Sequence, residues 1–212
     1  MVNKSENVIN FYLFSNVLKN KIRTGWLNME IKKERIESVA EHIYGCLMLA
    51  IALNSEYDLK LDMYKVLKMI SLHELEEILS PDYTPRDNLT KAERDEIGRK
   101  SVKKVVESLV KGREIAMLLE EFNAHETAES KFSYLIDKIE CDFQAKLYDL
   151  EGAFDIEKAR ADLPFYGDRA DYIEKHSKCA SDFWIEYDKP KFIDNAIFED
   201  LLKEILNLTR RN

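Results

Sequence analysis

The sequence has few of the residues that make tight turns, with only six Gly and four Pro among 212 residues. A fold of many β-strands needs frequent turns, so this scarcity disfavours β architectures. Long helices joined by short connections fit the composition better. We therefore predict an all-α fold, a helical bundle with additional C-terminal helices.

Cysteines and long apolar runs are also scarce. The three cysteines, Cys46, Cys141 and Cys179, are scattered and form no CxxC pair, which argues against a disulfide framework and suits a reducing compartment. The longest uninterrupted apolar run, Cys46 to Leu53, is far too short to cross a bilayer, and the N-terminus has no signal-peptide layout. We expect a soluble, cytoplasmic protein.

The chain has fewer basic than acidic residues. The formal net charge of −8 repels nucleic acid and anionic membranes, so neither is an expected partner. A phosphate-bearing small molecule stays possible, because a bound metal and one or two arginines can set the local field.

Apolar periodicity and capping residues divide the chain into helices. Ser38 with Glu41 is a capping box, and Thr90 is a second N-cap. The expected helices run from Ser5 or Asn7 to about Lys19, from Ser38 to about Ser55, and over 61–79, 90–111, 113–122, 126–150, 169–187 and 194–210. We predict one domain, 1–212, with a core at about 23–150 and a C-terminal helical pair at about 168–210.

Three acid or histidine positions interrupt apolar helices. His42 lies in the apolar second helix, the pair His73-Glu74 follows Met69, Ile70 and Leu72, and Asp137 stands among Leu135, Ile136 and Ile139. Each position alone has a structural reading that is at least as good. Burying charge is costly unless it is paired or coordinates a metal, so the set together favours a metal site.

Local strings around these positions point to a family. The strings are Arg23-Thr24-Gly25-Trp26, then Glu37-Ser38-Val39-Ala40-Glu41-His42, then His73-x-x-x-Glu77 with Asp82 and Pro85, and finally Asp137. Together they resemble the HD superfamily of metal-dependent phosphohydrolases, in particular its 5′-deoxynucleotidases. The matching positions cover a little over half of the chain. The resemblance implies an HD-domain-like helical bundle.

The resemblance also implies a site. His42, His73, Glu74 and Asp137 would hold one divalent metal ion: Mn, Co, Fe, Ni, Zn or Mg. Glu77 would orient water or shuttle a proton, and its spacing of four residues from His73 predicts one shared helical face. The substrate-binding residues would be Arg23 and Trp26 at the phosphate and Asp82 at the deoxyribose. Relatives of this kind suggest a homodimer.

The implied function is a phosphomonoesterase that hydrolyses deoxynucleoside 5′-monophosphates. The sequence departs from the family dipeptide, since His73 is followed by Glu74 where relatives carry Asp. Two alternatives stay open: hydrolysis of another small phosphate ester, and a low-activity or non-enzymatic metal-binding helical module. Trp26 also reads as a hydrophobic plug, and Asp82 as an ordinary turn residue.

Overall fold

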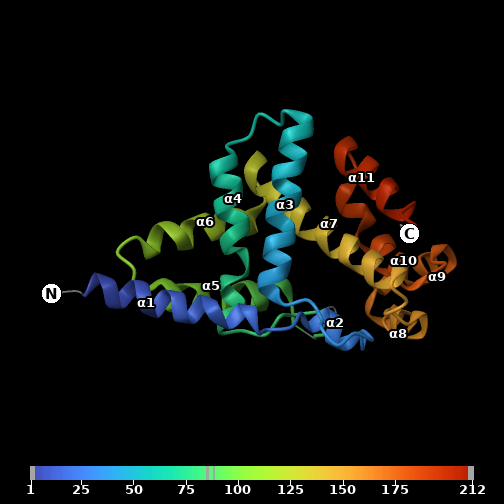
Figure 1. The fold of residues 1–212 in the computed structure, drawn as a ribbon, viewed down its shortest axis with the longest axis horizontal. Coiled ribbons are helices and arrows are strands. Elements are labelled where there is room, and N and C mark those ends of the chain that lie inside the picture. The colour runs from blue at the N-terminus through green and yellow to red at the C-terminus, as the bar shows by residue number, and fades with distance from the viewer. Residues whose placement is uncertain (1–2, 85, 88, 210–212) are drawn as a thin grey trace. The chain divides into compact units, whose positions relative to one another are not determined.

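The protein has an all-α fold, as predicted. A computed structural model describes residues 3–84, 86–87 and 89–209, and these contain no β-strand, only an isolated antiparallel bridge between Ile22 and Ser38. The elements in chain order are α1 (Lys4–Ser15), η1 (Asn16–Lys19), α2 (Thr24–Asn28), α3 (Val39–Tyr57), α4 (Met63–Leu72), η2 (His73–Ile78), α5 (Lys91–Val106), α6 (Gly112–Ala124), α7 (Ala128–Leu150), α8 (Ile156–Arg160), η3 (Leu163–Phe165), η4 (Gly167–Arg169), α9 (Ala170–His176), α10 (Ala180–Asp188), η5 (Lys189–Phe192) and α11 (Ala196–Leu206) (Figure 1).

The chain forms two compact units. The first comprises the described parts of Met1–Arg23, Glu37–Tyr83 and Asp87–Tyr134, and the second those of Thr24–Ile36, Thr84–Arg86 and Leu135–Asn212. Helix α7 begins in the first unit and continues into the second. The predicted single domain over 1–212 stays a prediction. Pro85 and Arg210, which entered the predictions above, lie outside the described residues.

The first unit is built on α3 and α4, which lie side by side (Figure 1). The inward face of α3 repeats at helical spacing through Val39, His42, Cys46, Ala50 and Leu53, all of them buried. The inward face of α4 consists of Val66, Met69 and Ile70, and this row leads directly to His73. Two apolar stripes therefore each carry a histidine into the interior.

Both predicted N-caps are confirmed. The Ser38 hydroxyl accepts a hydrogen bond from the backbone N–H of Glu41, whose carboxylate accepts one in return from the N–H of Ser38. Thr90 and Glu93 form the same reciprocal pair at the start of α5. Each box satisfies backbone donors that a helix start leaves without partners.

The first and third predicted helices differ from the structure. The N-terminal helix is capped by Asn3 and gives way to a 3-10 turn at Asn16, and α1 buries no residue, because most of its apolar side chains are exposed. The helix predicted over 61–79 is α-helical only to Leu72 and continues as the 3-10 segment η2. This tighter winding changes which side chains share a face.

The second unit has its own apolar core. Trp26, Tyr148, Phe154 and Phe183 are among its buried members. The predicted helix over 169–187 is broken into α9 and α10, and α11 buries its apolar face through Phe198, Leu202 and Ile205. Across the parts of the chain that are described, no helix is long and apolar enough to cross a membrane.

Candidate metal centre

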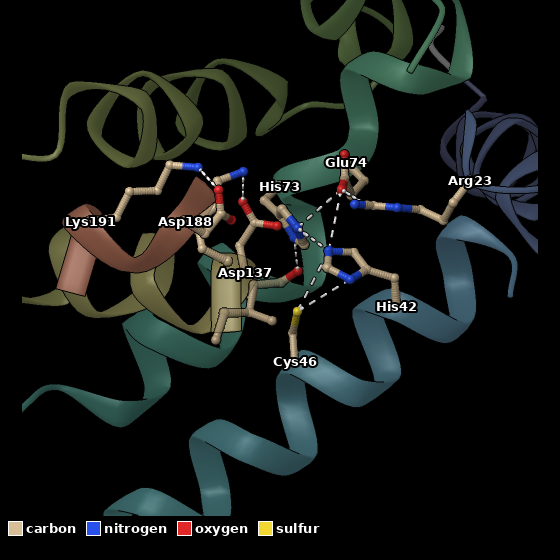
Figure 2. Close-up of polar contacts among 10 residues, drawn as sticks. Arg23, His42, Cys46, His73, Glu74, Asp137, Asp188 and Lys191 are labelled. Carbon is tan, nitrogen blue, oxygen red and sulfur yellow. Dashed lines mark hydrogen bonds and ion pairs between the residues drawn. The ribbon is translucent and has the colours of Figure 1, made fainter. Parts of the chain in front are cut away.

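His42 and His73 meet inside the first unit. The imidazole of His42 comes from the first turn of α3 and that of His73 from the junction of α4 and η2 (Figure 2). Their Nε2 atoms are 3.3 Å apart, and both residues are buried. The predicted pairing of these two histidines is therefore present in the structure.

A backbone contact fixes the tautomer of His73. Its Nδ1 lies 2.7 Å from the carbonyl oxygen of Ile70. A carbonyl only accepts hydrogen bonds, so Nδ1 carries the proton and donates it. A neutral imidazole in this tautomer would present a lone pair at Nε2, which is the arrangement usual for histidines that ligate metals.

The carboxylate of Glu74 completes a triangle of donor atoms. Its Oε1 lies 3.3 Å from Nε2 of His73 and 3.5 Å from Nε2 of His42. With the 3.3 Å between the two nitrogens, all three sides are nearly equal. Figure 2 shows the three side chains converging on one another.

This triangle fits a divalent cation. Metal–ligand bonds of about 2.1 Å at tetrahedral angles place neighbouring donors about 3.4 Å apart. Two imidazoles and a carboxylate are a borderline donor set that suits Mn, Fe, Co, Ni or Zn. Cys46 Sγ lies 3.6 Å from Nε2 of His42 and belongs to a second possible donor group with both histidines, whose ligand atoms all lie within 4.8 Å of one another.

Glu74 is held in its ionised form. Burial opposes the charge, but His73, Arg23 and His42 outweigh it and hold the pKa of Glu74 well below its usual range. Nη1 of Arg23 lies 2.8 Å from Oε1 of Glu74. The predicted phosphate-binding arginine is thus in direct contact with the candidate metal ligand (Figure 2).

Glu77 lies beside Glu74. The sequence had predicted that it would share a helical face with His73. Winding of three residues per turn in η2 stacks residues i and i+3, so Glu77 follows Glu74. Burial, reinforced by the negative charges of Glu74 and Asp82, raises the pKa of Glu77 to about 11. Its Oε2 is buried and has no hydrogen-bond partner among the described residues. A positive charge brought to this site would lower that pKa again.

Lys21 is a neighbour that the sequence reasoning did not assign to the site. Its Nζ donates hydrogen bonds to the carbonyl oxygens of Glu77 and Ser80 and lies 3.8 Å from Oε2 of Glu77. The available signal was its position two residues before Arg23 in an extended segment, where alternate residues share a side. Asp82 is half-buried and near enough to raise the pKa of Glu77.

Asp137 and Trp26 belong to the second unit. Asp137 lies on α7, less than one turn beyond Tyr134, is 8% exposed, and accepts a contact of 2.8 Å from Lys138. Trp26 is 1% exposed and stacks on Trp184 at 4.4 Å. Such burial in an apolar core suits the reading of Trp26 as a hydrophobic plug, and its predicted contact with a phosphate stays a prediction.

The fold and the site define a class: an all-helical protein whose core helices present two imidazoles and a carboxylate as a candidate metal site. The family model described as "HD domain" matches residues 15–179. The chain belongs to this HD domain family.

Curated relatives carry one activity in their names. The chain is 28% identical over 190 residues to 5′-deoxynucleotidase HDDC2 of Dictyostelium discoideum, covering 81% of this chain and 99% of that protein. It is 31% identical over 150 residues to the Danio rerio protein of the same name, covering 69% and 72%. The match to 5′-deoxynucleotidase hdd1 of Schizosaccharomyces pombe is 29% over 170 residues, covering 77% and 82%.

Solved structures share the fold. A conserved hypothetical protein from Pyrococcus furiosus superposes with a TM-score of 0.68 at 24% identity, covering 94% of this chain and 99% of the other. A predicted metal-dependent phosphohydrolase from Magnetospirillum magnetotacticum gives a TM-score of 0.62 at 18% identity, covering 99% and 100%. The helical architecture is therefore one that other chains adopt at low sequence identity.

Proposed function

We propose that this protein is a metal-dependent phosphomonoesterase that hydrolyses deoxynucleoside 5′-monophosphates to a deoxynucleoside and phosphate. The relatives named 5′-deoxynucleotidase support this activity over most of the chain. The observation that carries it is the triangle of His42, His73 and Glu74, whose sides of 3.3, 3.3 and 3.5 Å suit one cation.

The proposed ligands are His42, His73, Glu74 and Asp137. All four are buried, and each offers one ligand atom of a suitable kind. Asp137 would supply the fourth ligand from α7. When bound, a divalent ion supplies the charge that activates water and polarises a phosphoryl oxygen.

The remaining residues would handle phosphate, water and sugar. The guanidinium of Arg23 offers a fork of donors that suits a phosphate dianion. Glu77, with its buried and unpartnered Oε2, would orient the attacking water and carry a proton to the leaving nucleoside oxygen as the bond from that oxygen to phosphorus breaks. Asp82 would accept a hydrogen bond from the sugar. Trp26 stays a predicted residue of the phosphate site, and its burial suits a role in packing beside that site.

The test is phosphate release from deoxynucleotides and ribonucleotides with added Mn, Co, Ni, Zn or Mg. We expect turnover with at least one metal and a preference for deoxynucleoside 5′-monophosphates. Replacement of Glu77 by Gln keeps the side-chain shape and should lower kcat by about 100-fold or more. Glu56→Gln, at an exposed position on α3, is the matched control. Absence of turnover with every metal would refute the proposal.

We also propose a cytoplasmic homodimer. The three cysteines are free, as a reducing compartment requires. The apolar face of α11 is buried in the second unit, so a dimer would need another surface, and α3 offers Tyr44, Met48 and Ile51, which are 42–64% exposed along one face. Light scattering should give twice the chain mass, and Met48→Glu should give the monomer mass.

A further inference from the structure

Lys21 occupies a position from which it can fix the segment that carries Glu77. Its backbone is anchored, because its carbonyl accepts a hydrogen bond of 2.8 Å from the N–H of Val39 and the next residue, Ile22, bridges to Ser38. The N–H of Arg23 in turn donates to the carbonyl of Glu37 at 3.1 Å. The segment 21–23 is therefore an extended arm held against the start of α3.

This arm places two cations along η2. In an extended segment residues i and i+2 project to the same side, and here the two side chains reach opposite ends of the 3-10 helix. Arg23 contacts Glu74 in its first turn at 2.8 Å. Lys21 contacts the carbonyl oxygens of Glu77 at 2.5 Å and Ser80 at 2.7 Å, near its last turn.

The contacts of Lys21 suit a positioning role. The last carbonyls of a helix lack intrahelical partners, and an ammonium group satisfies them and complements their partial negative charge. Two of the three Nζ protons are used in this way. The same ammonium lies 3.8 Å from Oε2 of Glu77, which is too long for a hydrogen bond but places the ammonium directly beside that carboxyl group. Both side chains are sheltered, at 22% and 8% exposed.

We propose that Lys21 is a positioning residue for Glu77: it fixes the backbone turn over 77–80 and thereby the position of the Glu77 carboxyl group. This inference rests on the proposed function. It assigns to Lys21 an effect on turnover that acts through Glu77, without contact with the metal or the substrate.

The test replaces Lys21 by Met, which keeps the length of the side chain and removes the charge and all donors. A displacement of about 1 Å at a catalytic group can cost about 100-fold in rate, so we expect kcat to fall by about tenfold or more. KM and the metal dissociation constant, measured by calorimetry, should change by less than about twofold, because Lys21 touches neither ligand in the proposal. Lys21→Arg, which retains charge and donors, should recover most of the rate.

Lys19→Met is the matched control, since Lys19 is an exposed lysine at the end of η1. An unchanged kcat in a folded Lys21→Met protein, even with a lowered melting temperature, would overturn the proposal and leave Lys21 as a helix cap alone. Equal losses in Lys21→Arg and Lys21→Met would also overturn it, since charge and donors would then be irrelevant.

Hydrogen–deuterium exchange separates this inference from the proposed function. In Lys21→Met we expect faster exchange of the amides of residues 77–80 and 82, while peptides from α6 keep the wild-type rates. If the wild-type protein hydrolyses no nucleotide with any metal, the proposed function fails. Faster exchange over 77–82 would then still support the role of Lys21 in fixing this turn, and unchanged exchange there would overturn it.

Discussion

Replacement of Glu74 by Gln tests the centre of the site most directly. Glutamine keeps the length and shape of the side chain and removes its charge. Oε1 of Glu74 lies 2.8 Å from Nη1 of Arg23 and 3.3 Å and 3.5 Å from the two imidazole nitrogens. The substitution therefore weakens one ion pair in the metal-free protein and removes one anionic ligand from the metal-bound protein.

In the metal-free protein the cost comes from the pair with Arg23. A hydrogen bond to a charged group contributes about 1.5–3 kcal/mol, so Glu74→Gln should lower the free energy of unfolding by about that amount at pH 7 in the presence of a chelator. The folded pKa of Glu74 is lowered from its ordinary value of 4.5, so its stabilisation is present above that pH and is lost as pH falls through the folded pKa. The difference between wild type and variant should therefore shrink below about pH 4.5.

In the metal-bound protein the cost comes from the lost ligand. Outer-shell partners of metal ligands already contribute about 10–100-fold in affinity, so loss of a direct ligand should weaken binding by about 100-fold or more, equivalent to about 2.7 kcal/mol. Calorimetric titration and the rise in melting temperature on adding metal both measure this loss. Glu74→Asp restores the family dipeptide and should bind metal within about tenfold of wild type. A Glu74→Gln protein that binds metal as tightly as wild type would refute direct ligation.

Two further substitutions test the packing of each unit. Both carboxylate oxygens of Asp142 are buried without a hydrogen-bond partner among the described residues. Burial and a nearby carboxylate raise the pKa of Asp142. Its charge therefore destabilises the folded protein more and more as pH rises above 3.8, the ordinary pKa of an aspartate. Asp142→Asn should raise the free energy of unfolding by about 1–3 kcal/mol at pH 7 and by little near pH 4. Asp168→Asn, at an exposed position, is the control. Equal effects of Asp142→Asn at both pH values would contradict this reasoning. Gly112→Ala would place a Cβ 2.1 Å from the carbonyl oxygen of Val106 and should lower the melting temperature, at a cost of about 1–3 kcal/mol. Gly98→Ala, whose Cβ would meet only the end of a flexible side chain, should cost less, and a larger loss there would show that the backbone contact is not the cause.

The helices at the centre of the fold were predictable because local residues determine where they begin. Ser38 with Glu41 and Thr90 with Glu93 satisfy their own helix starts through contacts three residues apart, so the sequence contains the whole interaction. The scarcity of Gly and Pro also indicated an all-α fold. The apolar side chains of α1 misled the prediction, because their periodicity indicates a helix but does not show what packs against it.

The histidines were predictable for the same reason and their surroundings were not. His42 and His73 continue the inward rows of α3 and α4, which periodicity reveals. The 3-10 segment that begins at His73 receives contacts from distant residues. The hydroxyl of Ser101, on α5, donates to the carbonyl of Glu76 at 2.5 Å, and Lys21 donates to the carbonyl of Glu77. No spacing rule applied to residues 73–77 contains these partners.

The 3-10 winding also brings the carboxyl groups of Glu74 and Glu77 together. It places Glu77 after Glu74 on one face, so the two carboxylates share a buried environment that would be repulsive without positive charge. The extra methylene of Glu74 lets one oxygen reach both imidazoles and Arg23 at once. The contact of Arg23 with Glu74 supplies one opposing charge. A bound cation would supply another and would leave the guanidinium available to a phosphate, so metal binding should tighten phosphate binding. Calorimetry with inorganic phosphate, with and without metal, measures this coupling, which by linkage must be equal in both directions. Equal phosphate affinity in both states would show that the contact between Arg23 and Glu74 does not couple the two ligands.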